Sequence, residues 1–225
     1  MSSLGGQTIA RIYEAMIPPG GGWLADFILE TGPLPTVGAR LPLVIGDLTL
    51  AGGTVLRAGF DVPDQARVTV AGGGGWRALL ARASYQSGGG VRLSTVLRDL
   101  ASIAREPYDA PPDTTLGNAW GWPGSEPTAP VDARAALAAL VRHKAIPTWR
   151  VPPSGTTSFA RWPKGADCTT LGRIVGRDLS RGMRRVELDT RSAPFLPGAT
   201  IEGATIRRVV FREESRMLTV EAWES

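Results

Sequence analysis

Short apolar runs separated by glycine and proline dominate the pattern of this chain. Runs rich in Val, Ile, Leu, Thr and Arg recur roughly every ten residues, with turn-forming residues between them. In the clearest run, Val68 and Val70 alternate with Arg67 and Thr69, as they would in a strand with one buried face. The pattern therefore predicts many short antiparallel strands.

The predicted strands fall into an N-terminal pair, a central group and a C-terminal group. Pro18-Pro19 ends the first strand, and a bulge is expected where Gly52-Gly53 interrupts an apolar run. The turn at Pro152–Gly155 and the turn at Leu179–Gly182 each favour a hairpin. The predicted strands are Thr8–Ile17, Trp23–Leu29, Leu41–Ile45, Leu48–Leu56, Ala66–Ala71, Trp76–Tyr85, Thr148–Val151, Thr156–Arg161, Leu171–Asp178, Met183–Thr190, Thr200–Phe211 and Arg216–Trp223.

Two helices interrupt the strands. In Val91–Arg105 the apolar residues follow a 3.6-residue period, which predicts an amphipathic helix. Ser94 is the candidate N-cap of this helix, and Pro107 prevents the helix from continuing. A second helix is predicted for Val131–Arg142, where Asp132 favours the N-terminus.

These elements predict an α+β fold dominated by β-structure, with antiparallel β-barrel or sandwich domains and two helices. We divide the chain into an N-terminal arm (1–35), a first barrel-like domain (36–110), a Pro-rich connector (111–130) and a second β-rich domain (131–225). The connector carries Trp120 and Trp122, so we expect it to pack down or to dock on a neighbouring subunit.

Reactive side chains are scarce. Cys168 is the only cysteine, which excludes an intramolecular disulfide, a multi-cysteine zinc site and a redox pair. His143 is the only histidine, and its position between Arg142 and Lys144 at a helix end is typical of a cationic C-terminal cap. We therefore expect no catalytic, cofactor-binding or metal-binding residues, no cofactor and no enzyme activity.

The remaining motifs do not add chemistry. Gly72–Gly75 has no nearby lysine, so it is interpreted as a hairpin loop rather than a phosphate loop. The neighbouring pair Glu213-Glu214 would lie on opposite faces of a strand, which is poor for chelation. A glycosidase remains open because such an enzyme needs only two carboxylates. The available acids include Asp26, Glu30, Asp47, Asp61, Asp64 and Glu106.

Charge and hydropathy exclude few classes of binding partner. The chain has 25 Lys and Arg against 21 Asp and Glu, and Lys144 and Lys164 are the only lysines. A net charge of +4 permits contact with nucleic acid or an acidic partner without requiring either. The chain has no apolar run of about 18 residues and begins without the apolar stretch of a signal peptide, so we expect cytosolic folding and no membrane insertion.

Four segments carry a resemblance to a known family. GDLTLAGGTVLRAG (46–59) and RVTVAGGGGWRALLARASYQSGGGVRLSTVLRDLASIA (67–104) resemble small hub or baseplate proteins of phage and prophage tails. TWRVPPSGTTSFAR (148–161) and PGATIEGATIRRVVFREESRMLTVEAW (197–223) resemble the β-barrel segments of tail hubs related to the late control protein family. The chain is shorter than full-length hubs, so its position in the baseplate stays open.

The resemblance implies a structural role in a phage tail or a related contractile injection system. Such hubs link the tail tube to the spike and contact other baseplate proteins. They form a homo-oligomeric ring, with a trimer favoured and a hexamer possible, and DNA passes through only as transiting cargo. The implied location is the virion tail, assembled in the host cytoplasm.

Interfaces of such a ring favour tryptophan and arginine. Our interface candidates are Trp23, Trp76, Trp120 and Trp122, with core packing as the alternative for each.

Two other functions remain open on the sequence. An OB-like nucleic-acid-binding module would need aromatic side chains beside basic ones, for which Trp149-Arg150 and Phe159–Trp162 are a weak match. A tail-associated cell-wall hydrolase would need the carboxylate pair described above.

Overall fold

The computed structural model describes residues 2–30, 32–62, 65–81, 84–121, 131–188, 195–214 and 217–224. These residues form two compact units. The β unit comprises Met1–Gly74, Pro153–Gly155 and Trp162–Ser225, and the helical unit comprises Gly75–Pro152 and Thr156–Arg161. The fold is dominated by β-structure, as the sequence predicted, but neither unit is continuous in sequence.

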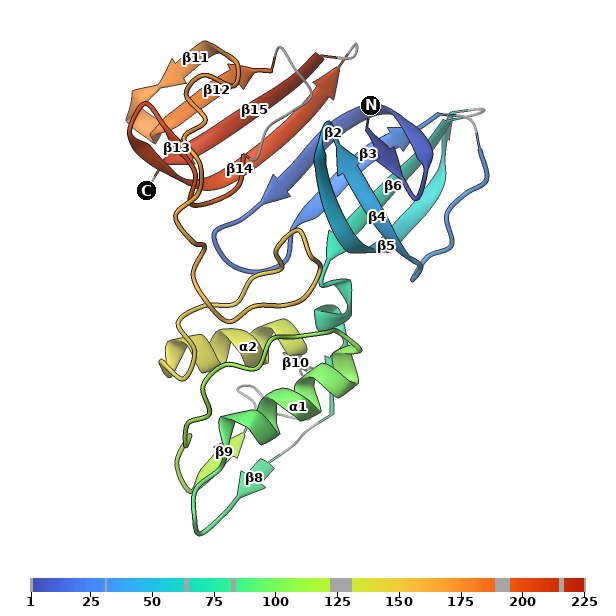
Figure 1. Cartoon of the computed structure of the whole chain (residues 1–225). Helices are drawn as coiled ribbons and strands as arrows, with labels where there is room; N and C mark the ends of the chain where they lie inside the picture. The colour runs from blue at the N-terminus through green and yellow to red at the C-terminus, as the bar shows by residue number, and fades with distance from the viewer. Residues whose placement is uncertain are drawn as a thin grey trace. The chain divides into compact units, whose positions relative to one another are not determined.

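A closed antiparallel barrel forms the first half of the β unit (Figure 1). The two-residue strand β1 (Ser3–Leu4) closes the barrel, because it pairs with β4 (Arg40–Ile45) on one edge and with β2 (Gln7–Ile17) on the other. Side chains such as Phe27, Val68 and Val70 fill the interior and are fully buried. In order around the barrel the strands are β1 (Ser3–Leu4), β4 (Arg40–Ile45), β5 (Leu48–Val62), β6 (Gln65–Gly72), β3 (Leu24–Leu29) and β2 (Gln7–Ile17).

The second half of the β unit continues from the barrel through β2. The far end of β2 pairs with β14 (Ala204–Glu214), and β14 pairs with β15 (Met217–Glu224). The sheet then runs through β12 (Met183–Glu187) to β11 (Arg173–Asp178). The short strand β13 (Thr200–Ile201) pairs with β14, and a 3-10 turn, η2 (Leu179–Arg181), connects β11 to β12.

The N-terminal residues therefore do not form an outlying arm. β2 and β3 lie side by side in the sheet, and β2 joins the barrel to the second half of the unit. The physical reason is long-range pairing, since β2 meets β14 through residues such as Ile17 and Val209, nearly two hundred positions apart. The sequence boundaries near 36, 111 and 131 accordingly do not coincide with the boundaries of the compact units.

Two glycines of the barrel make room for Trp23. A Cβ at Gly72 would lie 2.1 Å from the indole Nε1 of Trp23, and a Cβ at Gly53 would lie 2.6 Å from its Cη2. The bulge expected at Gly52-Gly53 is confirmed: β5 runs without a break from Leu48 to Val62, but its register with β4 shifts between the Leu41–Gly53 and Leu43–Leu50 pairs, and Gly52 has φ 66°. The absent side chain of Gly53 also lets the buried indole ring lie against the sheet.

The helical unit contains α1 (Leu93–Ala104) and α2 (Ala133–Arg142), both close to their predicted positions. The Asp132 carboxylate caps α2 by accepting a hydrogen bond from the Ala135 N–H at 2.9 Å, as predicted. Ser94 does not cap α1, because its own N–H donates to the Asp113 carboxylate at 2.9 Å. Within the described residues, neither helix is long and apolar enough to cross a membrane.

Short elements complete the helical unit. The segment predicted as one strand at Trp76–Tyr85 is instead a 3-10 turn followed by two very short strands. The strand β7 pairs with β10, and β8 pairs with β9. These elements are η1 (Gly74–Arg77), β7 (Leu79–Leu80), β8 (Ser84–Gln86), β9 (Ala119–Gly121) and β10 (Val131–Asp132).

The core of the helical unit is built around Trp76. Its ring packs edge-on against Trp149 with a centroid distance of 6.4 Å, and its Nε1–H donates to the Thr157 hydroxyl at 2.8 Å. Trp76 and Thr157 are fully buried. The predicted hairpin at 148–161 reduces to a single bridge between Arg150 and Ser158, because these residues pack into the core.

Candidate functional site

The β unit presents one face whose side chains point away from its core. In β6, Val68 and Val70 point inward, so Arg67 and Thr69 point outward. The register places Asp26 of β3 beside Thr69 on the same side. We call this surface the outer face, and it continues across neighbouring strands from β5 to β11 because they belong to one sheet.

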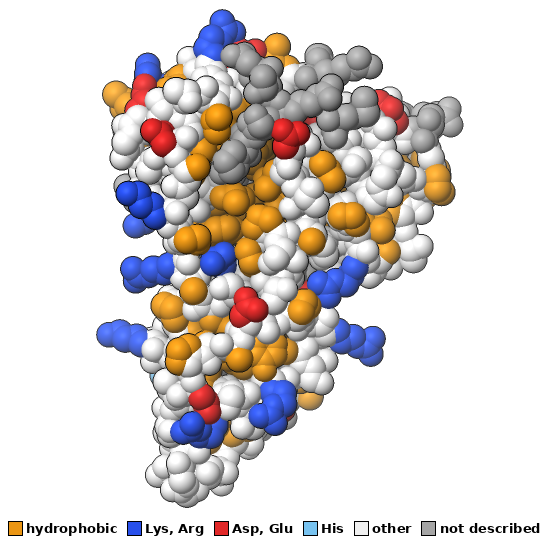
Figure 2. All heavy atoms as spheres, in the orientation of Figure 1, with side chains coloured by type: hydrophobic (Ala, Val, Ile, Leu, Met, Phe, Trp, Pro, Cys, Tyr) orange, Lys and Arg blue, Asp and Glu red, His pale blue; other side chains and the backbone are white. Residues whose placement is uncertain are grey.

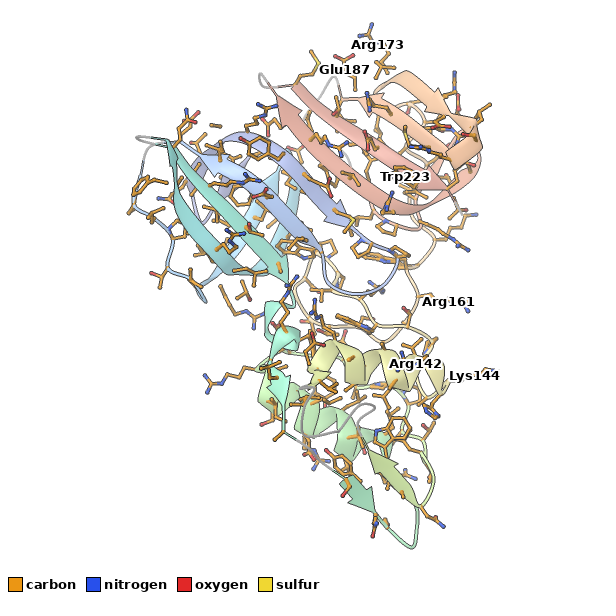
Figure 3. The ribbon with its side chains drawn as sticks, turned by 180° about the vertical axis from the view of Figure 1, so that it is seen from behind. Arg142, Lys144, Arg161, Arg173, Glu187 and Trp223 are labelled. Atoms are coloured by element: carbon orange, nitrogen blue, oxygen red, sulfur yellow. The ribbon has the colours of Figure 1, made fainter. Side chains whose placement is uncertain are left out.

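Ion pairs join the strands of the outer face in the second half of the unit. Arg173 of β11 pairs with Glu187 of β12 at 2.5 Å, at the edge of the sheet labelled in Figure 3. Arg185 of β12 pairs with Glu221 of β15 at 2.8 Å. Arg212 of β14 pairs with the same Glu221 at 2.6 Å. Each pair links two adjacent strands, so positive and negative charges alternate across the sheet.

The ion pairs continue into the barrel. Arg212 also reaches Glu14 of β2 at 3.2 Å. Glu14 lies directly opposite Asp26 of β3, and Asp26 pairs with Arg67 of β6 at 2.5 Å. The Thr69 hydroxyl donates to the Asp26 carboxylate at 3.4 Å. We call this series of ion pairs from β11 to β6 the charge ladder.

Glu221 is the most buried member of the charge ladder, with 7 % of its surface exposed. Burial raises the pKa of this carboxyl, but hydrogen bonds and charges from Arg212 and Arg185 outweigh burial and lower the pKa overall. For Arg212, burial lowers the pKa while Glu221 and Glu14 raise it, and the net shift is upward. Both groups are thus held in their charged forms, and the ladder is electrostatically satisfied.

Arginine also stacks on aromatic rings on this sheet. The guanidinium carbons of Arg11 and Arg67 each lie 5.0 Å from the centroid of the Tyr13 ring. Arg208 of β14 lies 4.2 Å from the centroid of the Trp223 ring on the adjacent strand β15. Figure 3 labels Trp223, which lies on β15, the strand that also carries Glu221 of the ladder. These contacts hold long side chains against the sheet and leave charge on its surface.

A shallow groove of about 400 Å³ opens at the barrel end of the outer face. Asp26 is the one carboxylate among its described lining residues, and Phe60 on its wall is 65 % exposed. A glycosidase requires two carboxylates across its cleft, so the described lining does not form such a site. The groove is lined by Asp26, Arg57, Ala58, Gly59, Phe60, Arg67 and Thr69.

The few reactive side chains do not converge. Among the described residues, no group of three or more His, Cys, Asp and Glu side chains could hold a metal ion. Cys168 is buried, and burial raises the pKa of its thiol, which keeps it unreactive. His143 caps the C-terminus of α2, and its ring lies 4.9 Å from that of Trp120.

The tryptophans chosen from the sequence as interface candidates lie mostly inside the fold. Trp23 and Trp76 are fully buried, and Trp120 is 9 % exposed. Core packing, the alternative considered for each, is what the structure shows for these three rings. Trp122 lies outside the described residues.

The residues proposed for nucleic-acid stacking are also internal. Trp149 and Phe159 are buried, and Arg150 is buried and donates to the Ala160 carbonyl at 2.8 Å. Arg161 is exposed, but Trp162 donates its indole N–H to the Pro18 carbonyl at 3.3 Å. These particular residues therefore form no aromatic platform of the kind that an OB-like module uses.

The charge ladder was not found from the sequence. Its signal was present as charged residues at alternate positions, for example Arg185 with Glu187. That alternation indicates a solvent-facing side of a strand. It does not indicate which distant strand supplies the opposite charge.

Comparison with solved structures identifies the fold. The 43 kDa tail protein of prophage MuSo2 from Shewanella oneidensis superposes with a TM-score of 0.65 at 9 % identity, over 99 % of this chain and 97 % of that chain. A tail protein from Neisseria meningitidis MC58 superposes with a TM-score of 0.57 at 12 % identity, over 100 % of this chain and 95 % of that one.

A third similar structure comes from a secretion system. The E. coli c3393 protein superposes with a TM-score of 0.59 at 11 % identity, over 100 % of this chain and 77 % of that chain. It is described as a type VI secretion component that resembles the bacteriophage T4 tail proteins gp27 and gp5. No protein-family model and no curated protein sequence matches the chain. The chain thus has the fold of phage tail proteins.

Proposed function

We propose that this chain is a non-enzymatic structural component of the central hub or baseplate of a phage tail, or of a related contractile injection system. The observation that carries the proposal is a superposition on prophage tail proteins that spans essentially the whole chain. In this role the protein links the tail tube to the spike through contacts with other baseplate proteins. It acts in the virion tail after assembly in the host cytoplasm.

The outer face suits the wall of a channel. In the charge ladder each carboxylate meets a guanidinium, so the surface is polar but offers few unpaired charges to a passing molecule. Exposed ion pairs of this kind contribute little to binding a new partner because their charges are already compensated. DNA or an effector protein would therefore pass such a wall as cargo without being held.

The edge strand β11 supports assembly into a ring. Among the described residues, β11 hydrogen-bonds to β12 on one edge and has no strand on its other edge. Val175 is 46 % exposed and Leu179, in the following turn, is 75 % exposed. Open strand edges with apolar side chains favour pairing with another chain. We infer that a second copy pairs here, in a closed ring with a trimer favoured over a hexamer.

Mass measurement in solution tests the ring. Light scattering coupled to size-exclusion chromatography should give a multiple of the 23.8 kDa protomer mass, and three is the expected multiple. The double variant Val175→Glu with Leu179→Glu should reduce this mass to that of the protomer. The matched control replaces two other exposed apolar residues, Ile103 and Met217, with Glu and should keep the wild-type mass. A wild-type protein that stays monomeric at high concentration would contradict self-assembly.

The non-enzymatic role has its own test. Zymography on peptidoglycan should show no clearing by the purified protein. Clearing would contradict the structural role and favour a cell-wall hydrolase.

A further inference from the structure

The net charge of the chain belongs entirely to the helical unit. The residue ranges of the β unit contain 15 Lys and Arg and 15 Asp and Glu. Those of the helical unit contain ten Lys and Arg but only six Asp and Glu, so they account for the whole net charge of +4. Figure 2 shows Lys and Arg side chains extending from both margins of the helical unit. A net positive charge confined to one unit favours association of that unit with acidic partners.

Three cations gather near the C-terminal end of α2. Arg142 is the last residue of α2, Lys144 follows it, and Arg161 comes from a different segment of the same unit. Figure 3 shows all three side chains extending from the same side of the helical unit. All are exposed, and none has an acidic partner among the residues that the structure describes. We call these residues the basic corner.

The helix end places Lys144 in an unusual conformation. The Ala145 N–H donates to the Leu140 carbonyl at 3.0 Å, and the Lys144 N–H donates to the Val141 carbonyl at 2.9 Å. These two bonds form the Schellman motif, whose left-handed position usually holds glycine. Lys144 occupies that position with φ 58°. The motif therefore tolerates a strained lysine backbone, which fixes the direction in which the Lys144 side chain leaves the helix.

We propose that the basic corner docks an acidic segment of a partner protein. The corner presents three exposed cations on one side of the helical unit, which matches a short run of carboxylates. A nucleic acid is less suited, because binding a duplex engages several more phosphates and a single strand requires exposed aromatic rings. The Trp120 ring, which meets the His143 imidazole edge-on at 4.9 Å, is only 9 % exposed.

A structural role is the alternative for two of these cations. Arg142 and Lys144 lie at the negative end of the α2 macrodipole and stabilise the helix there. That effect fades within the last turn and does not explain Arg161, which lies outside the helix. A purely structural role would alter thermal stability and leave binding unchanged.

A binding assay with the full-length protein tests the proposal. Fluorescently labelled poly-glutamate peptide serves as the acidic probe at low salt, and affinity is measured by anisotropy. The triple variant Arg142→Glu, Lys144→Glu, Arg161→Glu should bind the peptide at least tenfold more weakly than wild type. The control variant reverses three other exposed cations, Arg98, Lys164 and Arg207, and so makes the same charge change. It should remain within about twofold of wild type.

Each other outcome overturns the proposal. Equal losses in both variants would show that binding follows overall charge and not the corner. If the wild-type protein binds a DNA duplex or phosphatidylserine vesicles more tightly than the peptide, the basic corner binds phosphate groups and not the carboxylates of a protein segment. If the wild-type protein shows no measurable peptide binding at low salt, the basic corner does not dock acidic segments. None of these results bears on ring formation, which the mass measurement tests separately.

Discussion

Glu14 and Asp26 lie directly opposite each other on the adjacent strands β2 and β3, so two carboxylates face one another across the pair. Like charges at this position destabilise a sheet. Arg212 compensates Glu14 from β14, and Arg67 compensates Asp26 from β6. The strand that joins the two halves of the β unit is therefore held by charges supplied from both sides.

Replacing Arg212 with Ala should lower the free energy of unfolding of the β unit by about 1–2 kcal/mol. The change removes the cation paired with Glu14 and one of two cations that contact the buried Glu221. Urea denaturation followed by circular dichroism measures the loss. Adding Glu14→Gln should recover part of it, because it removes the carboxylate facing Asp26.

The matched control is Arg173→Ala at the sheet edge. The Arg173 side chain is 72 % exposed, so its pair with Glu187 should contribute no more than about 0.5 kcal/mol. Equal losses from the two arginine variants would contradict the role assigned to Arg212.

Stability should fall in acid, and Glu221 should be one of its causes. Its pKa in the folded chain is lower than the ordinary value of about 4.3, so its stabilising effect is complete above that value. The effect is lost as pH falls through the lower folded pKa, where the carboxyl takes up a proton. The difference in urea midpoint between wild type and Glu221→Gln should therefore be largest at pH 7 and shrink toward pH 3. A constant difference would contradict this origin.

The sequence was sufficient for elements with a strong local signal. The 3.6-residue period placed both helices, and the turn at Leu179–Gly182 placed the β11–β12 hairpin. The sequence was insufficient wherever two paired strands are far apart along the chain. Arg212 and Glu14 are 198 positions apart, and nothing in either local pattern connects them. The closing strand β1 has only two residues, too few to show any period.

The sequence left each candidate tryptophan open between an interface and the core. For Trp23 the structure shows why its ring is buried, because Gly53 and Gly72 on two other strands leave space for it. That space exists only once the barrel has formed. The sequence analysis therefore chose aromatic residues for the candidate surface, whereas the structure builds that surface from ion pairs between strands.

Gly72→Ala should strongly destabilise the barrel. The added Cβ would lie 2.1 Å from Trp23 Nε1, and the buried ring has little room to move. We expect a loss of more than about 3 kcal/mol or no folded β unit at all. Gly59→Ala is the control, because a Cβ there meets nothing within 4 Å. It should change the thermal midpoint by no more than a few degrees, and a similar loss at both positions would contradict the packing argument.

The buried bond between Trp76 and Thr157 offers a test within the helical unit. Trp76→Phe leaves the Thr157 hydroxyl without its indole donor, which should cost about 1–3 kcal/mol in the free energy of unfolding. Thr157→Val leaves the indole N–H unpaired and should cost a similar amount. Because the double variant removes both polar groups, its loss should be smaller than the sum of the two single losses. Urea denaturation of all four proteins completes the cycle. Strictly additive losses would mean that the bond contributes nothing, and that Trp76 stabilises the core through its contact with Trp149 alone.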